Sequence, residues 1–178
     1  MGIKSFLNKD YMNYNTEKII KPRKKIQKTS FKPFRMMLVI RYRRLLLKMQ
    51  SFLPLSKTIS NNIIYPHGLS GVFISNGAIV GDGCVIFQQV TIGSNALPGS
   101  KNEGSPRIGE NCYIGAGAKI IGKVKVGDNV RIGANTVVIK DVPDNATVVG
   151  SKFRLIEHKE ILDNRFMSYS KKEEKREE

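Results

Sequence analysis

A six-residue repeat runs through the middle of the chain and limits the folds open to it. Aliphatic residues recur at every sixth position from 74 to 92 and again from 108 to 138. Six is a multiple of the strand period of two and not of the helical period of 3.6, so the repeat places one apolar side on a series of short strands. The ten positions are Ile74, Val80, Ile86, Ile92, Ile108, Ile114, Ile120, Val126, Ile132 and Val138.

The fifth place of the hexapeptides is also restricted, since it holds only small or β-branched residues that point to the same side as the aliphatic residue. Glycine follows the aliphatic residue in six of the units and supplies the corners between strands. A single unit cannot bury its own apolar face, so the units must stack into a β-solenoid. The residues at the fifth place are Ala78, Cys84, Val90, Cys112, Ala118, Val124, Val130, Thr136 and Val142.

The repeat is interrupted once, and the interruption divides the central region. The step from Ile92 to Ile108 is sixteen residues, which is not a multiple of six, so residues 94–107 are predicted to leave the coil as a protruding loop. Loops on a rigid scaffold often carry function. The domain prediction is a basic N-terminal arm and helix over 1–60, the hexapeptide region over 61–150, and a C-terminal cap with a charged tail over 151–178.

The N-terminal arm carries most of the positive charge. Residues 1–66 have a net charge of +13, out of +15 for the whole chain. We expect residues 4–32 to be mostly disordered or loosely docked, and residues 34–52 to form a basic helix ended by Pro54. Basic arms bind nucleic acid, anionic membranes or only water, and charge alone does not choose among them.

Cysteine, histidine and hydropathy patterns limit the remaining classes. Cys84 and Cys112 occupy core places of the repeat, and with only His67 and His158 beside them they make a poor zinc set, so no metal is expected. The longest apolar run, 36–40, is far shorter than the roughly 20 residues needed to span a bilayer, and no signal peptide precedes it. The expectation is a cytoplasmic protein.

Three runs of sequence resemble the hexapeptide-repeat acyltransferases. They are Gln89-Val-Thr-Ile-Gly93, Ile114-Gly-Ala-Gly-Ala-Lys-Ile-Ile-Gly122 and residues 132–143, and the resemblance covers roughly 61–156. The chain is most similar to the serine-acetyltransferase-like branch, which includes capsule and exopolysaccharide O-acetyltransferases. The resemblance implies an all-β fold, a left-handed parallel β-helix with three hexapeptides per coil, and a homotrimer with acetyl-CoA between neighbouring solenoids.

The resemblance also implies site residues. The run Tyr65-Pro-His-Gly-Leu-Ser-Gly-Val-Phe-Ile74 matches the family's catalytic motif with one extra residue, so His67 is the predicted base. Acetyl transfer to a hydroxyl needs a base that titrates near neutral pH, which imidazole provides. The residues implied for the cofactor are Ala116 and Ala134, through their backbone groups, and Lys140, with Lys152 and Arg154 as weaker candidates for its phosphates.

Two adjacent glutamines and the loop leave further roles open. Only one of Gln88 and Gln89 can face the cleft, and either could orient the acceptor. Gln89 and Asn95 are candidates for stabilising the oxyanion, a role that the sequence does not assign.

The acceptor is predicted from departures from the family pattern. Serine acetyltransferases carry Asp before the catalytic His and Arg-His-Pro in the protruding loop, where this chain has Pro66 and Gly104-Ser105-Pro106. Because a carboxylate needs a paired cation, we expect a hydroxyl of a sugar or polysaccharide precursor instead of serine. The alternatives are a serine O-acetyltransferase of cysteine biosynthesis and a non-enzymatic basic binding solenoid.

The expected partners follow from the predicted sugar acceptor and from the basic N-terminal arm. The acceptor would be a small or lipid-linked sugar. Residues 1–52 could contact the anionic inner face of the membrane, or could remain a solvated arm that aids solubility or trimer contacts. No nucleic acid partner is expected.

Overall fold

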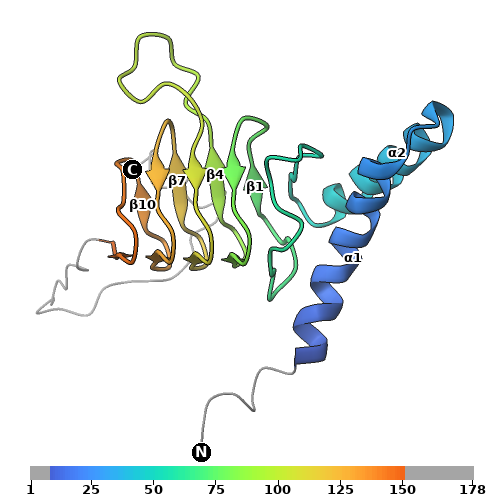
Figure 1. The fold of residues 1–178 in the computed structure, drawn as a ribbon, viewed down its shortest axis with the longest axis horizontal. Helices are drawn as coiled ribbons and strands as arrows, with labels where there is room; N and C mark the ends of the chain where they lie inside the picture. Colours follow the sequence, from blue (N-terminus) through green and yellow to red (C-terminus); the bar gives the residue numbers. More distant parts are fainter. Residues whose placement is uncertain (1–8, 151–178) are drawn as a thin grey trace, which may run out of the picture.

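The computed structural model describes residues 9–150, which form two helices followed by a stack of short strands (Figure 1). The helices lie beside one end of the stack, and the strands run coil after coil away from them. The elements are α1 Lys9–Lys28, α2 Lys32–Lys48, β1 Phe73–Ile74, β2 Ile79–Val80, β3 Val85–Ile86, β4 Thr91–Gly93, β5 Arg107–Ile108, β6 Tyr113–Ile114, β7 Lys119–Ile121, β8 Lys125–Val126, β9 Arg131–Ile132, β10 Val137–Val138 and β11 Thr147–Val148.

The strands form three parallel sheets, which makes the stack a β-helix with three faces. The sheets have the orders β1-β4-β7-β10, β11-β9-β6-β3 and β2-β5-β8. Phe73 pairs with Thr91 and Lys119 pairs with Val137, eighteen residues apart in each case. A coil therefore contains three hexapeptides, as the resemblance implies.

Parallel pairing also reaches residues that precede the recognised repeat, and two of them, Phe52 and Ile59, lie in the predicted N-terminal arm. Single bridges join Phe52 to Phe73, Ile59 to Val80 and Ile64 to Val85. These three bridges form an additional first coil. Its three strand positions precede Ile74, where the six-residue repeat begins.

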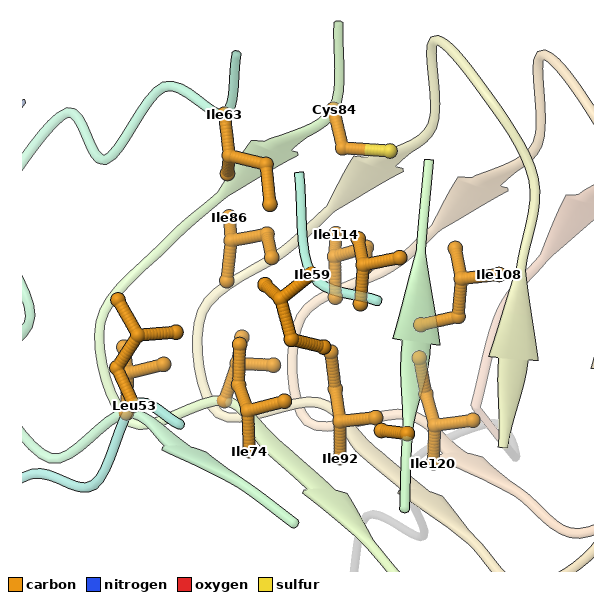
Figure 2. Close-up of a cluster of buried hydrophobic side chains, with 14 of the residues drawn as sticks. Leu53, Ile59, Ile63, Ile74, Cys84, Ile86, Ile92, Ile108, Ile114 and Ile120 are labelled. Atoms are coloured by element: carbon orange, nitrogen blue, oxygen red, sulfur yellow. The ribbon is translucent and has the colours of Figure 1, made fainter. Parts of the chain in front are cut away.

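The core is the column of repeat side chains. All ten aliphatic residues at the first place are at most 3% exposed, and the nine residues at the fifth place are at most 9% exposed. Figure 2 shows Leu53, Ile74, Ile92 and Ile120 following one another through successive coils. The predicted register of the repeat is therefore confirmed.

Close stacking of the coils explains why glycine is needed at some corners. A Cβ atom added at Gly115 would lie 2.7 Å from the backbone nitrogen of Ala134 in the next coil. A side chain at this position would force the two coils apart, so glycine is required by the close approach.

The N-terminal helices differ from expectation in one respect. The expectation of a mostly disordered segment over 4–32 is wrong for the residues of α1, because this helix packs on the first coil through buried Ile19, Ile26 and Arg23. The Arg23 guanidinium donates hydrogen bonds to the carbonyl oxygens of Pro54 and Ile59, both at 2.9 Å. These backbone partners lie more than thirty residues from Arg23 in the sequence, so no local pattern in the basic segment indicates them.

The second helix is confirmed with shifted bounds. Helix α2 covers Lys32–Lys48 and ends before Gln50, which has a left-handed backbone with φ of 48°, so the helix stops several residues ahead of Pro54. Its buried residues are Tyr42 and Leu46. Neither helix in the described range 9–150 has the length and apolar character that a bilayer crossing requires.

Candidate active site

His67 lies in the turn that leads into β1 and is held there by its neighbours. Pro66 and Leu69 are buried, whereas His67 is exposed. The imidazole Nδ1 lies 2.8 Å from the Oε1 atom of Gln88. The ring also meets Phe87 edge to face, with centroids 5.6 Å apart and an angle of 88° between the planes.

The contact with Gln88 determines which imidazole nitrogen can act as a base. An amide oxygen accepts hydrogen bonds and does not donate them, so the Nδ1 atom of neutral His67 carries the proton. The lone pair then remains on Nε2. An exposed imidazole in this tautomer can take a proton from a hydroxyl group brought to Nε2.

The turn that holds His67 is longer than the corners stacked on it. Ile64 pairs with Val85 twenty-one residues later, whereas Phe73 pairs with Thr91 eighteen residues later. The three additional residues lie between these two pairs, in the turn of residues 66–71. The three additional residues place His67 beside Gln88. The eighteen-residue period by itself does not pair these two residues.

One corner of the coil brings together most of the predicted site residues. We call it the His67 corner and define it by the stacked turns 66–71, 87–90, 115–118 and 133–136. Backbone hydrogen bonds join these turns, and they run from Gln89 N to Ser70 O at 2.8 Å, from Gly117 N to Gln88 O at 3.0 Å, and from Asn135 N to Ala116 O at 2.8 Å. His67, Ala116 and Ala134 therefore lie along one edge of the solenoid.

The His67 corner also separates the roles of the two glutamines. The equivalent positions Gly71, Gln89, Gly117 and Asn135 all have positive φ, between 54° and 71°. Gln89 occupies this left-handed position with a long side chain, which is uncommon and costs backbone energy. Its carbonyl oxygen accepts a hydrogen bond from Lys119 Nζ at 2.7 Å, while the Gln88 side chain contacts His67. The sequence analysis could not choose between these two residues.

The predicted loop leaves the coil at a second corner, which we call the loop corner and define by residues 75–78, 94–106, 122–124 and 139–141. The loop projects beyond the strands between β4 and β5 (Figure 1) and is closed by an antiparallel bridge from Asn95 to Gly104. Asn102 fixes the loop to later coils, because its Nδ2 atom donates to Ile139 O at 2.9 Å and its carbonyl oxygen accepts from Lys123 N at 3.0 Å.

Lys140 belongs to the loop corner and not to the His67 corner. It is exposed and lines a hollow of about 370 Å³ formed by residues 137–143 and 146–148. The sheet β1-β4-β7-β10 lies between the two corners, so Lys140 and Ala134 flank the same sheet from opposite edges. Arg154 and Lys152 lie outside the described residues.

One corner of the coil carries a column of acidic side chains. Asp82, Glu110, Asp128 and Asp144 stack at the third corner, where Asp128 accepts from Glu110 N at 2.7 Å and Asp144 accepts from Asp128 N at 2.9 Å. The loop corner carries both signs of charge, since Lys123 and Lys140 lie there with Glu103 and Asp141. The acidic column therefore disfavours an anion at the third corner.

The two cysteines are part of the core, as predicted. Cys84 and Cys112 are buried, and their thiols donate to the carbonyl oxygens of Gly109 at 3.3 Å and Gly127 at 3.1 Å. Hydrogen bonding with Cys112 and burial both raise the pKa of Cys84. A protonated, inaccessible thiol is a poor nucleophile. Among residues 9–150, no three His, Cys, Asp or Glu side chains are grouped closely enough to hold a metal ion.

Comparison with known families agrees with this architecture. Residues 105–140 match the family described as bacterial transferase hexapeptide (six repeats). The repeat in this part of the chain is similar to that of the hexapeptide transferases. The hexapeptide repeat and the parallel sheets together make the solenoid a left-handed parallel β-helix.

Several curated proteins that are similar over the hexapeptide repeat are serine acetyltransferases. The serine acetyltransferase of Synechococcus elongatus is 45% identical over 98 residues, which are 55% of this chain and 39% of the relative. The serine acetyltransferase of a Synechocystis species is 46% identical over 98 residues, or 55% of this chain and 38% of the relative. This chain thus matches about two fifths of the length of these curated relatives. The solved apoenzyme of soybean serine acetyltransferase is 28% identical with a TM-score of 0.59, covering 81% of this chain and 58% of that one.

These relatives overturn the predicted acceptor. The prediction of a sugar or polysaccharide O-acetyltransferase is wrong, because the matching curated proteins are serine acetyltransferases. That prediction considered only the residues at the motif positions, which are Pro66 and Gly104-Ser105-Pro106. In the folded chain Gly104 packs against the side chain of Lys123, with an added Cβ atom 3.2 Å from the Cβ atom of Lys123. The side chain of Lys123, from a neighbouring coil, therefore lies at the base of the loop, beside Gly104, where the family's motif begins with arginine.

Proposed function

We propose that this chain transfers the acetyl group of acetyl-CoA to the hydroxyl group of serine, with His67 as general base. The observation that carries the proposal is the contact between His67 Nδ1 and Gln88 Oε1, because it leaves Nε2 free to accept the hydroxyl proton. The names of the relatives that match over the hexapeptide repeat support serine as the acceptor.

The proposed reaction is a direct transfer. As the serine hydroxyl oxygen attacks the thioester carbonyl carbon, His67 Nε2 takes its proton and a tetrahedral intermediate forms. The intermediate collapses by breaking the bond to sulfur, and the imidazolium returns its proton to the CoA thiolate. An acyl-enzyme is not part of the mechanism, since Cys84 and Cys112 are buried in the coil interior.

For the cofactor, we propose a position along the sheet β1-β4-β7-β10, between the His67 corner and the loop corner. Backbone groups of Ala116 and Ala134 would line one edge of this position, and Lys140 would meet the phosphates at the other. The acidic column of the third corner lies away from this position, and Asp141 beside Lys140 accepts a hydrogen bond from Lys125 N at 2.8 Å. Arg154 remains a candidate from the sequence.

A homotrimer is proposed with the same site. Outward-facing apolar side chains of the sheets are exposed in the single chain, as shown by Phe73 at 48% and Val137 at 61%. Packing of a neighbouring solenoid against these faces would cover them and enclose the cofactor. Light scattering should give three times the chain mass at micromolar concentration, and a monomer mass would contradict the proposal.

The decisive experiment compares His67→Ala with the wild-type protein. Release of the CoA thiol on addition of serine measures turnover, and calorimetry measures acetyl-CoA binding. We expect kcat to fall by about 10²-fold or more, while the Kd for acetyl-CoA changes by about twofold or less. The substitution His158→Ala at the other histidine of the chain is the matched control.

Two results would overturn the proposal. Retention of near-wild-type turnover in His67→Ala would remove the general base. A wild-type protein that neither binds acetyl-CoA nor releases CoA with serine would favour a non-enzymatic binding solenoid.

A further inference from the structure

Helix α2 has an exposed line of apolar side chains in addition to its buried face. Its inner face buries Tyr42 and Leu46 against α1 and the first coil. Its other side exposes Met36 by 67%, Ile40 by 46% and Leu47 by 74%. Ile40 follows Met36 by four residues and Leu47 follows Ile40 by seven, so the three side chains lie in one line along the helix. We call this line, with the exposed Met37 beside it, the outer face of α2.

Cationic side chains flank the outer face, and α2 contains no acidic residue. The sequence of α2 contains six Lys and Arg residues and no Asp or Glu. At 100° per residue, the exposed Arg43 and Arg44 lie on either side of the line from Met36 to Leu47. A hollow of about 550 Å³, lined mainly by apolar residues, continues the surface from Arg43 and Leu47 toward Phe52 and Pro54.

Charge decides which occupant fits the outer face. A second copy related by two-fold symmetry would bring Arg43 and Arg44 toward the same cations of its partner, with no carboxylate on either α2 to compensate. An anionic bilayer is complementary to both the apolar line and the flanking arginines. The exposed aliphatic side chains can enter the boundary of the acyl chains, and the guanidinium groups can pair with lipid phosphates.

We propose that the outer face of α2 docks the protein on the surface of an anionic phospholipid bilayer, with the helix lying in the interface. Within residues 1–52, the proposed membrane contact consists of the four apolar side chains of the outer face together with Arg43 and Arg44. It does not depend on the acetyl transfer proposed above, since the residues of the outer face are separate from the His67 corner.

The test uses the full chain and vesicles of phosphatidylglycerol mixed with phosphatidylcholine. We expect the wild-type protein to co-float with these vesicles at low salt and not with vesicles of phosphatidylcholine alone. The triple substitution Met36→Ser, Ile40→Ser and Leu47→Ser should weaken binding by about tenfold or more, since all three side chains are exposed and leave the core intact. Arg43→Ala with Arg44→Ala should weaken binding and reduce its salt dependence.

Matched controls separate the outer face from general effects. Val149→Ser removes another exposed apolar side chain, which is 72% exposed at the far end of the coil. Lys125→Ala with Arg131→Ala removes two exposed cations from the coil. Both controls should bind the vesicles within about twofold of the wild type.

Three outcomes would overturn the proposal. Failure of the wild-type protein to bind anionic vesicles at low salt would do so, as would equal binding by the outer-face variants and their controls. The third outcome is a change in oligomeric state. If light scattering shows fewer chains per assembly in the triple variant than in the wild type, the outer face joins protein chains.

Discussion

The Nδ1 atom of His67 and the Oε1 atom of Gln88 lie 2.8 Å apart, on turns that belong to successive coils. Gln88 is itself fixed, because its backbone carbonyl oxygen accepts a hydrogen bond from Gly117 N at 3.0 Å in the following coil. The orientation of the imidazole is thereby tied to the stacking of three coils. An amide partner orients the ring without adding a charge to it.

The first prediction concerns Gln88 as the residue that positions His67. Gln88→Ala should lower kcat by about tenfold, because His67 loses the acceptor that selects its tautomer and orientation. Gln88→Glu should retain the orientation but place a carboxylate beside the imidazole, which favours the protonated ring. The acid limb of the kcat/KM profile should therefore move to higher pH in Gln88→Glu. Identical profiles for the wild type and Gln88→Glu would show that the contact does not act on the base.

The second prediction concerns Lys140 and the cofactor. Removing a cation that pairs with phosphate should cost about 1.5 kcal/mol, so Lys140→Ala should raise the Kd for acetyl-CoA by roughly tenfold. Turnover at saturating acetyl-CoA should change little. Lys125→Ala is the control, because Lys125 is also exposed but lies on the sheet β2-β5-β8. Equal affinities of the two variants for acetyl-CoA in calorimetry would remove Lys140 from the site.

The third prediction concerns Arg23 and the stability of the first coil. Arg23→Leu should lower the free energy of unfolding by about 3 kcal/mol, because the carbonyl oxygens of Pro54 and Ile59 lose a buried donor. Lys24→Leu at the exposed neighbouring position is the control. Denaturant unfolding followed by circular dichroism measures both variants. A loss below about 1 kcal/mol in Arg23→Leu would mean that α1 does not depend on these hydrogen bonds.

The fourth prediction concerns the thiols. Cys84→Ala should keep kcat within about twofold of the wild type and lower the free energy of unfolding by about 1 kcal/mol, because it removes a buried side chain of the core. Because hydrogen bonding and burial raise its pKa, Cys84 in the native protein should react slowly with iodoacetamide near neutral pH. Loss of turnover in a folded Cys84→Ala trimer would instead indicate an acyl-enzyme.

The repeat was sufficient to predict the coil because its information is local and periodic. Positions such as Ile92 and Ala118 face inward in every unit, and the single break in the period located the protruding loop. His67 is predicted as the base from a motif that precedes the repeat. The departures at Pro66 and in the loop were misread, because a sequence motif records which residues a loop contains and not which side chains of other coils approach it.

The sequence by itself determined the β-solenoid, its apolar column, the loop and the core position of both cysteines, since strand alternation and the six-residue period act between near neighbours. Only the tertiary structure decided that Gln88 and not Gln89 contacts His67, that Arg23 holds α1 to the first coil, and that α2 keeps an uncovered apolar face. These features depend on residues twenty or more positions apart. Such contacts arise only when coils and helices pack, so no local pattern specifies them.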